Sequence, residues 1–115
     1  MRFALLRFFV VPALLLASCT SNQGNFSLVN KATESIAHVS VGICGQTIEL
    51  NGIKSNDRLT GSYKVTSDSH YTIEVEFQSG RKIKKETGYV TNGMNFRHEI
   101  TVTDSDIRIT DTKVN

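Results

Sequence analysis

The chain lacks tryptophan altogether and has only one proline and two cysteines among its 115 residues. Without tryptophan, the Cys…Trp…Cys signature of antibody domains is missing. The two cysteines, Cys19 and Cys44, form neither a Cys-x-x-Cys redox pair nor a zinc-binding pattern. The single proline, Pro12, lies in an N-terminal apolar segment, so no strand of the following domain is interrupted.

Without that N-terminal segment, the sequence also has no net charge, counting Lys, Arg, Asp and Glu. The chain carries 13 Lys+Arg and 11 Asp+Glu, and Arg2 and Arg7 account for the whole difference. A general nucleic-acid binder would show net positive charge or a clear basic stripe, so we expect no nucleic-acid partner. Residues 19–115 suffice for one domain with one core, not two.

The N-terminal segment has the features of a secretory signal peptide. Residues 8–17 read FFVVPALLLA, without a charge, and follow a short stretch that carries Arg2 and Arg7. A membrane-spanning helix needs roughly 20 apolar residues, so this run is too short to cross a bilayer. Its length, flanking charge and polar continuation predict that residues 1–18 are a signal peptide.

The residues at the end of that segment point to a particular kind of processing. The motif Leu16-Ala17-Ser18-Cys19 resembles the lipobox of bacterial lipoproteins, in which Leu and two small residues precede an obligatory Cys. The resemblance covers the first nineteen residues and implies cleavage before Cys19, a diacylglycerol on its sulfur, and acylation, for example with palmitate, of the freed amino group. Two or three acyl chains anchor a protein durably in a membrane, whereas one does not. Thr20 stands where Asp would mark inner-membrane retention, which implies the outer membrane, facing the periplasm.

Two alternatives remain open: ordinary cleavage that leaves a soluble periplasmic or secreted protein, and an uncleaved anchor. If Cys19 is lipidated, Cys44 has no intramolecular partner, and we expect it to be a buried, inert, small hydrophobic residue. An intermolecular disulfide or a reactive thiol is the alternative for Cys44. Residues 19–25 are polar and lack periodicity, which predicts a lipidated Cys followed by a short tether.

From Phe26 onward, apolar and polar residues alternate. The clearest run places Tyr71, Ile73, Val75 and Phe77 between polar residues. Strict alternation indicates strands with one buried and one solvated face, as in antiparallel sheets. Similar runs occur at residues 37–43, 48–50, 63–65, 94–102 and 107–109.

Turn signals separate these runs. Ser79-Gly80 and Asp104-Ser105 each predict a turn between two strands. Asn92-Gly93 is the best short hairpin signal, because a type I′ turn needs positive φ at both central residues. Asn51-Gly52 and residues 54–61 predict a longer connection.

Together, these patterns predict seven or eight short strands in residues 26–115 and no helix. The fold we expect is all-β: a small antiparallel β-sandwich of immunoglobulin or fibronectin type. A small closed β-barrel is the alternative.

One basic cluster stands out, formed by Arg81, Lys82, Lys84 and Lys85. Along a strand these charges fall on both faces, which predicts an edge strand whose lysines block pairing with other molecules. The functional alternative is contact with an anionic partner, such as lipopolysaccharide phosphates, surface glycans or an acidic protein.

Tyr89 lies in the distinctive string of residues 88–93, GYVTNG. We expect Tyr89 to pack at a strand end while the glycines serve the turn, with presentation at a binding end as the alternative. Lipoprotein inhibitors of lysozyme carry similar Gly/Tyr-rich loops, although no residue role is transferred from them.

Signals for catalysis or metal binding are sparse. His38, His70 and His98 form no close pair, and we expect isolated surface or hydrogen-bonded core histidines rather than metal ligands. Asp104-Ser105-Asp106 lacks the Gly and distal Glu of a calcium loop. The sequence contains no nucleophile elbow and no phosphate-binding Gly-rich loop. We therefore expect neither catalytic residues nor a cofactor.

These observations predict a lipid-anchored cell-envelope protein with a non-catalytic binding or structural domain. Its partners would be the membrane, through the N-terminal lipid, and an envelope protein. The alternative is a periplasmic inhibitor or immunity-type protein that acts on a cell-wall hydrolase.

Overall fold

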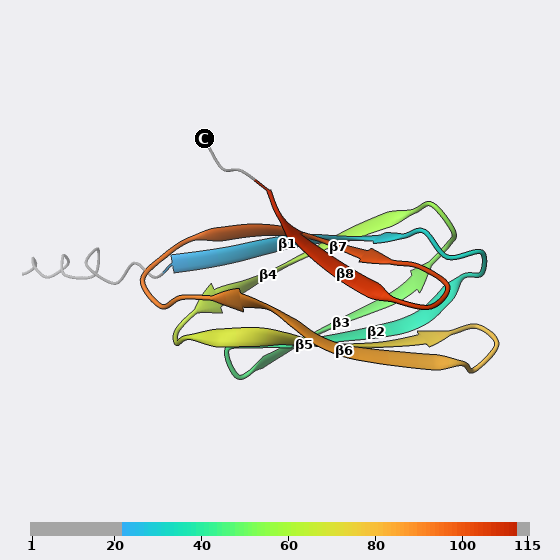
Figure 1. Cartoon of the computed structure of the whole chain (residues 1–115), viewed down its shortest axis with the longest axis horizontal. Coiled ribbons are helices and arrows are strands. Elements are labelled where there is room, and N and C mark those ends of the chain that lie inside the picture. The colour runs from blue at the N-terminus through green and yellow to red at the C-terminus, as the bar shows by residue number, and fades with distance from the viewer. Residues whose placement is uncertain (1–21, 113–115) are drawn as a thin grey trace, which may run out of the picture.

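A computed structural model describes residues 22–112, which form eight strands and no helix (Figure 1). No segment within these residues is a helix long and apolar enough to cross a membrane. The strands are β1 (Asn22–Asn30), β2 (Ile36–Ile43), β3 (Gln46–Ile53), β4 (Arg58–Val65), β5 (Ser69–Phe77), β6 (Lys82–Val90), β7 (Phe96–Val102) and β8 (Ile107–Asp111).

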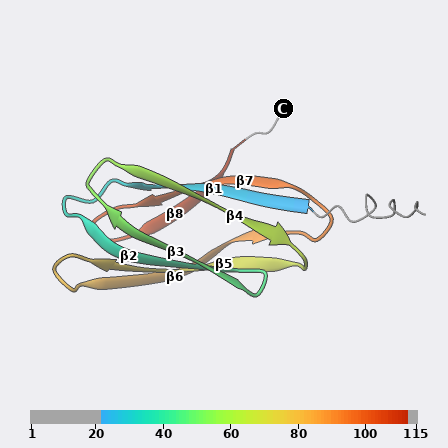
Figure 2. The same cartoon turned by 180° about the vertical axis from the view of Figure 1, so that it is seen from behind.

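The strands of residues 22–112 form two four-stranded sheets with the orders β4-β1-β7-β8 and β3-β2-β5-β6. The sheets pack face to face, as the front and back views show (Figures 1 and 2). The predicted all-β sandwich is therefore confirmed, and the closed barrel is wrong. Three hairpins, β2–β3, β5–β6 and β7–β8, stay within one sheet, whereas the other connections cross between sheets.

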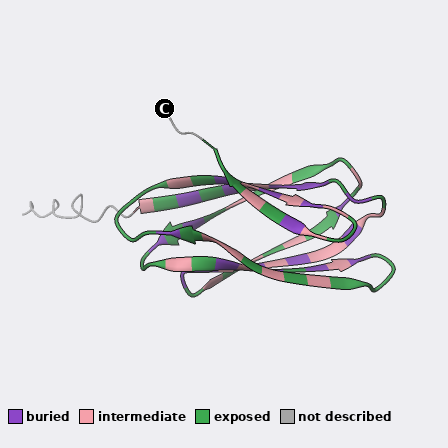
Figure 3. Ribbon diagram, viewed as in Figure 1, coloured by how far each residue is buried: buried purple, intermediate pink, exposed green. Residues whose placement is uncertain are grey.

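The core lies between the sheets and follows the alternation in the sequence (Figure 3). On β5, Tyr71, Ile73, Val75 and Phe77 are each at most 1% exposed, and the intervening residues face solvent at least partly. Burying a large apolar side chain contributes about 1.5–3 kcal/mol, so inward positions dominate the stability of the sandwich. The other sheet contributes Phe26, Leu28, Tyr63, Val65, Ile100, Val102 and Ile107.

Two glycines on neighbouring strands make room for two aromatic rings. Gly24 on β1 lies opposite Tyr63 on β4, and Phe26 on β1 lies opposite Gly61 on β4. A Cβ built on Gly24 would lie 2.1 Å from Cζ of Tyr63, and one built on Gly61 would lie 2.5 Å from Cζ of Phe26. Each ring therefore occupies the space above the opposite glycine, a cross-strand arrangement that fixes the register of β1 against β4.

One strand pair departs from the expected antiparallel arrangement. β1 pairs with β7 in parallel, from Gly24 opposite Phe96 to Asn30 opposite Val102. Parallel neighbours need a long connection between them. Here the chain passes through the second sheet between β1 and β7, so β7 returns in the direction of β1.

The first strand begins earlier than its apolar pattern predicts. Asn22–Asn25, expected to be tether, belong to β1, with Asn22 opposite Val65 and Asn25 opposite Ser62. The apolar signal is missing because the inward position is Gly24, which is covered by the ring of Tyr63. The predicted signal peptide, the cleavage motif Leu16-Ala17-Ser18 and Cys19 lie outside the described residues.

The prediction of a hairpin at Asn92-Gly93 is wrong. These two residues lie in the connection from β6 in one sheet to β7 in the other. The tight two-residue hairpin lies instead at Cys44-Gly45, between β2 and β3, where φ is +51° and +70°. An Asn-Gly pair adopts positive φ at low energetic cost, but it does not determine which strands the turn joins.

The other turn predictions had mixed outcomes. Ser79-Gly80 and Asp104-Ser105 are turns, between β5 and β6 and between β7 and β8. The longer connection expected over Asn51-Gly52 and residues 54–61 is wrong, because Asn51-Gly52 lies within β3 and β4 begins at Arg58. Only residues 54–57 connect these strands. The apolar pattern of β4 is interrupted at its inward Gly61, which the ring of Phe26 covers.

Candidate functional site

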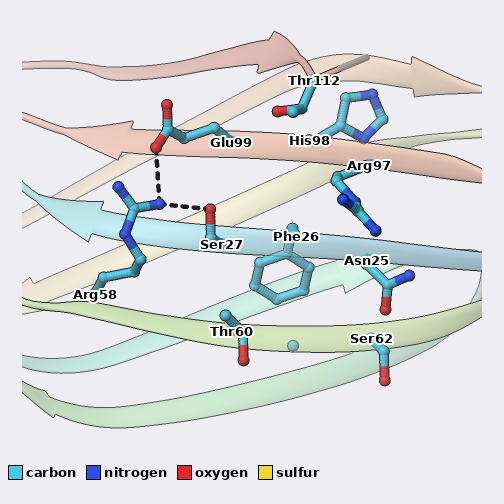
Figure 4. A pocket seen from close by; sticks show the side chains of 11 residues that line it. Asn25, Phe26, Ser27, Arg58, Thr60, Ser62, Arg97, His98, Glu99 and Thr112 are labelled. Atoms are coloured by element: carbon cyan, nitrogen blue, oxygen red, sulfur yellow. Dashed lines mark hydrogen bonds and ion pairs between the residues drawn. The ribbon is translucent and has the colours of Figure 1, made fainter. Parts of the chain in front are cut away.

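A hollow in the surface of residues 22–112 lies on the outer face of the β4-β1-β7-β8 sheet. This polar concavity measures about 590 Å³ and is open to solvent. Figure 4 shows its side chains rising from three adjacent strands. The residues that give it its chemical character are Asn25, Ser27, Thr60, Ser62, Arg97 and Glu99.

Strand register arranges these side chains in two rows. The first row is Ser62, Asn25 and Arg97, which face one another across β4, β1 and β7. The second row, two residues along each strand, is made in the same way by Thr60, Ser27 and Glu99. Because neighbouring strands lie about 4.8 Å apart, each row presents hydrogen-bonding groups at regular spacing on a rigid surface.

Arg58 closes one side of the concavity. Its Nη1 donates to Oγ of Ser27 at 2.9 Å and to Oε2 of Glu99 at 2.8 Å (Figure 4). Glu99 is therefore paired, whereas Arg97 is exposed at the other end of the concavity. A guanidinium beside hydroxyl and amide groups suits a carboxylate, phosphate or other polar acceptor.

His98 also lines the concavity but is only 3% exposed, and it connects to a chain of buried polar groups. Its Nε2 lies 2.7 Å from Oδ1 of Asp111, and its Nδ1 lies 2.9 Å from the hydroxyl of Tyr71. The Tyr71 hydroxyl lies 2.5 Å from that of Tyr63. The four groups thus form one hydrogen-bonded chain from the core to the surface.

The acceptor at the surface sets the direction of every bond in this chain. The Asp111 carboxylate accepts, so Nε2 of His98 carries the hydrogen and Nδ1 accepts from the Tyr71 hydroxyl. The Tyr71 oxygen in turn accepts from Tyr63. Burial lowers the pKa of His98, against the opposing effect of Asp111, and burial raises the pKa of both tyrosines. All three groups are thus held in their neutral forms.

This series of hydrogen-bonded side chains resembles a catalytic triad in its connectivity but not in its accessibility to solvent. Tyr71 is 0% exposed and packs edge-on against Tyr63 and His98, with ring centroids 5.8 and 5.2 Å away. A substrate cannot reach its hydroxyl without displacing the core. The arrangement therefore serves as a fully hydrogen-bonded link between the two sheets. The sequence placed Tyr63, Tyr71 and His98 on apolar faces but gave no signal that they meet.

A second hollow, of about 320 Å³, lies on the outer face of the other sheet and has an acidic lining. His38 there contacts Glu49, and its Nδ1 donates a 2.7 Å hydrogen bond to Oδ1 of Asn51. The Asn51 bond, opposed by desolvation and aided by Glu49, raises the pKa of His38. Within residues 22–112 no group of three His, Cys, Asp or Glu side chains is arranged to hold a metal ion.

Three residues of the predicted basic cluster, Lys82, Lys84 and Lys85, lie on β6, which is an edge strand as expected, and Arg81 lies directly before it. The charges of the cluster do not gather into one patch. Lys82 and Lys84 point outward, opposite Glu76 and Glu74 on β5. Lys85 points the other way and pairs with Asp106 at 3.0 Å.

Arg81 joins three loops at the end of the sandwich away from the start of β1. Its Nη2 lies 3.2 Å from Oε2 of Glu34, and its Nη1 donates to the backbone oxygen of Asp104 at 2.6 Å. Its guanidinium also lies 4.2 Å from the centre of the Phe77 ring. The side chain is thus engaged within the domain, as is Lys85.

The prediction that Tyr89 packs at a strand end is wrong. Tyr89 is 58% exposed, and Met94, predicted to share the buried face of the following strand, is 53% exposed. Met94 lies in the loop before β7, which begins at Phe96. These are the two exposed large hydrophobic side chains of residues 22–112.

Cys44 is buried, at 8% exposure, as expected. Its Sγ lies 3.4 Å from the backbone oxygen of Ser67, and its backbone N–H donates to Oγ of Ser69 at 2.9 Å. The sequence did not reveal its second role, as a residue of the β2–β3 turn.

The fold and the concavity define a small β-sandwich with an open polar face. A solved structure, the NMR structure of a protein from Eubacterium rectale, has the same architecture, with a TM-score of 0.57 over 81% of this chain and 91% of that chain. Its sequence is 17% identical, so the likeness concerns the fold alone. No protein-family model and no curated protein matches this chain.

Proposed function

We propose that this protein is a lipid-anchored component of a bacterial cell envelope, attached to the outer membrane through Cys19. Its sandwich acts as a non-catalytic binding or structural domain for an envelope partner. The observation that carries this proposal is the position of the domain relative to the lipobox. β1 begins at Asn22, three residues after Cys19. With about 3.8 Å between consecutive Cα atoms, at most about 11 Å separates the acylated residue from the folded domain.

The polar concavity is the surface we assign to the partner. Its donors and acceptors stand on paired strands, so they are held in place before binding, which reduces the entropy lost on association. Its exposed Arg97 offers a guanidinium to an acidic or carbonyl group of the partner.

The anchor is tested by the intact mass of the chain extracted from membranes, for the native protein and for Cys19→Ala. The expected mass begins at Cys19 and includes acyl chains, which the variant lacks. A soluble, unlipidated protein cut nearby would contradict the anchor. In that case Cys19, if retained, becomes available to pair with Cys44.

The partner is tested by placing a photo-crosslinking residue in the concavity in intact cells. Ser62 is the test position, and Thr47, exposed on the outer face of the other sheet, is the control. Capture of an envelope subunit from Ser62 alone supports the proposal. Capture of a cell-wall hydrolase whose activity falls on mixing would favour the inhibitor instead. Equal capture from both positions would contradict the assignment of the concavity.

A further inference from the structure

The two ends of the sandwich differ sharply in charge. The N-terminal end, where β1 begins, carries the connections 44–45, 66–68 and 91–95, in which Asp68 is the one residue of the types Asp, Glu, Lys, Arg and His. The opposite end carries the connections 31–35, 54–57, 78–81 and 103–106 (Figure 1). The charged residues in those four connections are Lys31, Glu34, Lys54, Asp57, Arg81, Asp104 and Asp106.

The weakly charged end is also where apolar side chains face solvent. Met94 lies in the 91–95 loop, and Tyr89 lies at the end of β6 that leads into it. Tyrosine favours the headgroup region of membranes, and methionine is a flexible apolar side chain that adapts to irregular surroundings. The same end thus combines exposed apolar groups with little charge to desolvate.

Hydrogen bonds hold this loop against the start of the domain. Oδ1 of Asn95 accepts from the backbone N–H of Gln23 at 2.9 Å and from Nδ2 of Asn22 at 3.2 Å. The backbone N–H of Asn92 donates to Oδ1 of Asp68 at 2.8 Å, so the single acid of this end is already engaged. The exposed apolar residues therefore lie beside the point where the chain enters the domain.

From this we propose that the N-terminal end of the sandwich rests on the lipid surface, with Tyr89 and Met94 in the headgroup region. This inference rests on the proposed lipid anchor, because the short span from Cys19 to Asn22 holds this end close to the bilayer. Two side chains bury too little apolar area to bind vesicles alone. The anchor supplies a high effective concentration at the membrane, at which even the weak contact of these two side chains with lipid is populated.

The test uses the absence of tryptophan from the chain, which makes any introduced tryptophan a unique fluorophore. Full-length Met94→Trp is purified from membranes and reconstituted into phosphatidylethanolamine and phosphatidylglycerol vesicles that contain lipids brominated near the headgroup. Ser105→Trp, at an exposed position in the β7–β8 turn, is the matched control at the opposite end. The nine residues of β1 span about 30 Å, so bromine cannot reach that control position.

We expect brominated lipid to reduce emission from Met94→Trp and to leave emission from Ser105→Trp unchanged. Equal quenching of the two variants would overturn the orientation, as would no quenching of either. Blue-shifted but unquenched emission from Met94→Trp would mean that a second copy of the chain covers this end, and would overturn the proposal too.

Intact mass separates this inference from the anchor on which it rests. An acylated chain without quenching at Met94→Trp overturns the orientation alone. A chain without acyl groups overturns both. Met94→Trp in a chain that begins at Thr20, and so lacks both Cys19 and the apolar N-terminal segment, is expected to stay in the supernatant when vesicles are sedimented. Its retention by the vesicles would overturn the view that the anchor brings this end to the lipid.

Discussion

The hydroxyl of Tyr71 lies 2.9 Å from Nδ1 of His98, and the bond joins the two sheets inside the core. Tyr71 stands on β5 in one sheet, whereas His98 stands on β7 in the other. The hydroxyl oxygen of Tyr71 also accepts a hydrogen bond from the hydroxyl of Tyr63, which stands in the same sheet as His98. The contact between the sheets is therefore polar as well as apolar, and the stability lost when the polar part is removed can be measured.

We expect Tyr71→Phe to destabilise the domain by about 1–3 kcal/mol, because it leaves buried polar groups of His98 and Tyr63 without a partner. Tyr89→Phe removes the same hydroxyl from an exposed ring and should change stability by less than about 0.5 kcal/mol. Urea unfolding of the chain without residues 1–19 compares the two midpoints. Equal midpoints would show that the buried chain of hydrogen bonds contributes nothing.

The two histidines with shifted pKa values predict opposite responses to acid. Burial lowers the pKa of His98, so the unfolded chain binds its proton more readily and stability falls as pH drops below about 6.5. The bond to Asn51, opposed by desolvation and aided by Glu49, raises the pKa of His38. Its contribution is present below the unfolded pKa and is lost as pH rises through the folded one.

His38→Gln should therefore steepen the loss of stability between about pH 7.5 and about pH 5, and His98→Gln should flatten or reverse it. Urea midpoints across this range measure both slopes. Asp104 and Asp106 contribute little in this window, because bonds from Thr33 and Lys85, respectively, lower their pKa values. If the two variants changed the slope in the same direction, the assigned signs would be wrong.

Gly24→Ala should destabilise the domain by about 1–3 kcal/mol, since its Cβ would overlap the ring of Tyr63 and force it to move. Gly42→Ala, in the neighbouring sheet, is the control, because the nearest atom to its Cβ is the backbone oxygen of Thr72 at 3.7 Å. Thermal melts of the two variants test the pairing. A Gly24→Ala melt that matched the Gly42→Ala melt would contradict the close fit of ring and glycine.

Ile73→Asp should abolish cooperative unfolding, because it puts an unpaired charge at a position that is 0% exposed. Lys84→Glu should leave the fold intact and cost about 0.2–1 kcal/mol, since it sets a second carboxylate opposite Glu74. Circular dichroism melts rank the two variants. The reverse ranking would mean that the strand register is wrong.

Alternation was sufficient to predict the strands whose inward residues are all apolar. β5 is the clearest case, because Tyr71 to Phe77 is buried on one face and solvated on the other, and local sequence records that difference directly. The start of β1 escaped because its inward residue is Gly24, whose burial depends on a ring supplied by β4. The missed segment is thus one whose inward position is covered by an apolar ring from elsewhere in the chain.

Features that depend on which strands become neighbours could not be predicted in this way. Asn92-Gly93 permits positive φ but joins strands of different sheets, whereas Cys44-Gly45 makes the tight hairpin. The polar concavity likewise exists because Asn25 falls between Ser62 and Arg97, residues far apart in sequence. Only the register of three strands brings such groups together.

The central position of β1 determines how the domain would bear mechanical load. β1 is paired along both sides, antiparallel to β4 over eight residue pairs and parallel to β7 over seven. In a protein tethered through Cys19, a pull between the membrane and a partner on the sheet would run along β1. Its hydrogen bonds lie across that direction, so the force would shear both ladders at once instead of opening them one bond at a time. Under the proposed anchoring through Cys19, β1 would thus be among the hardest strands to extract.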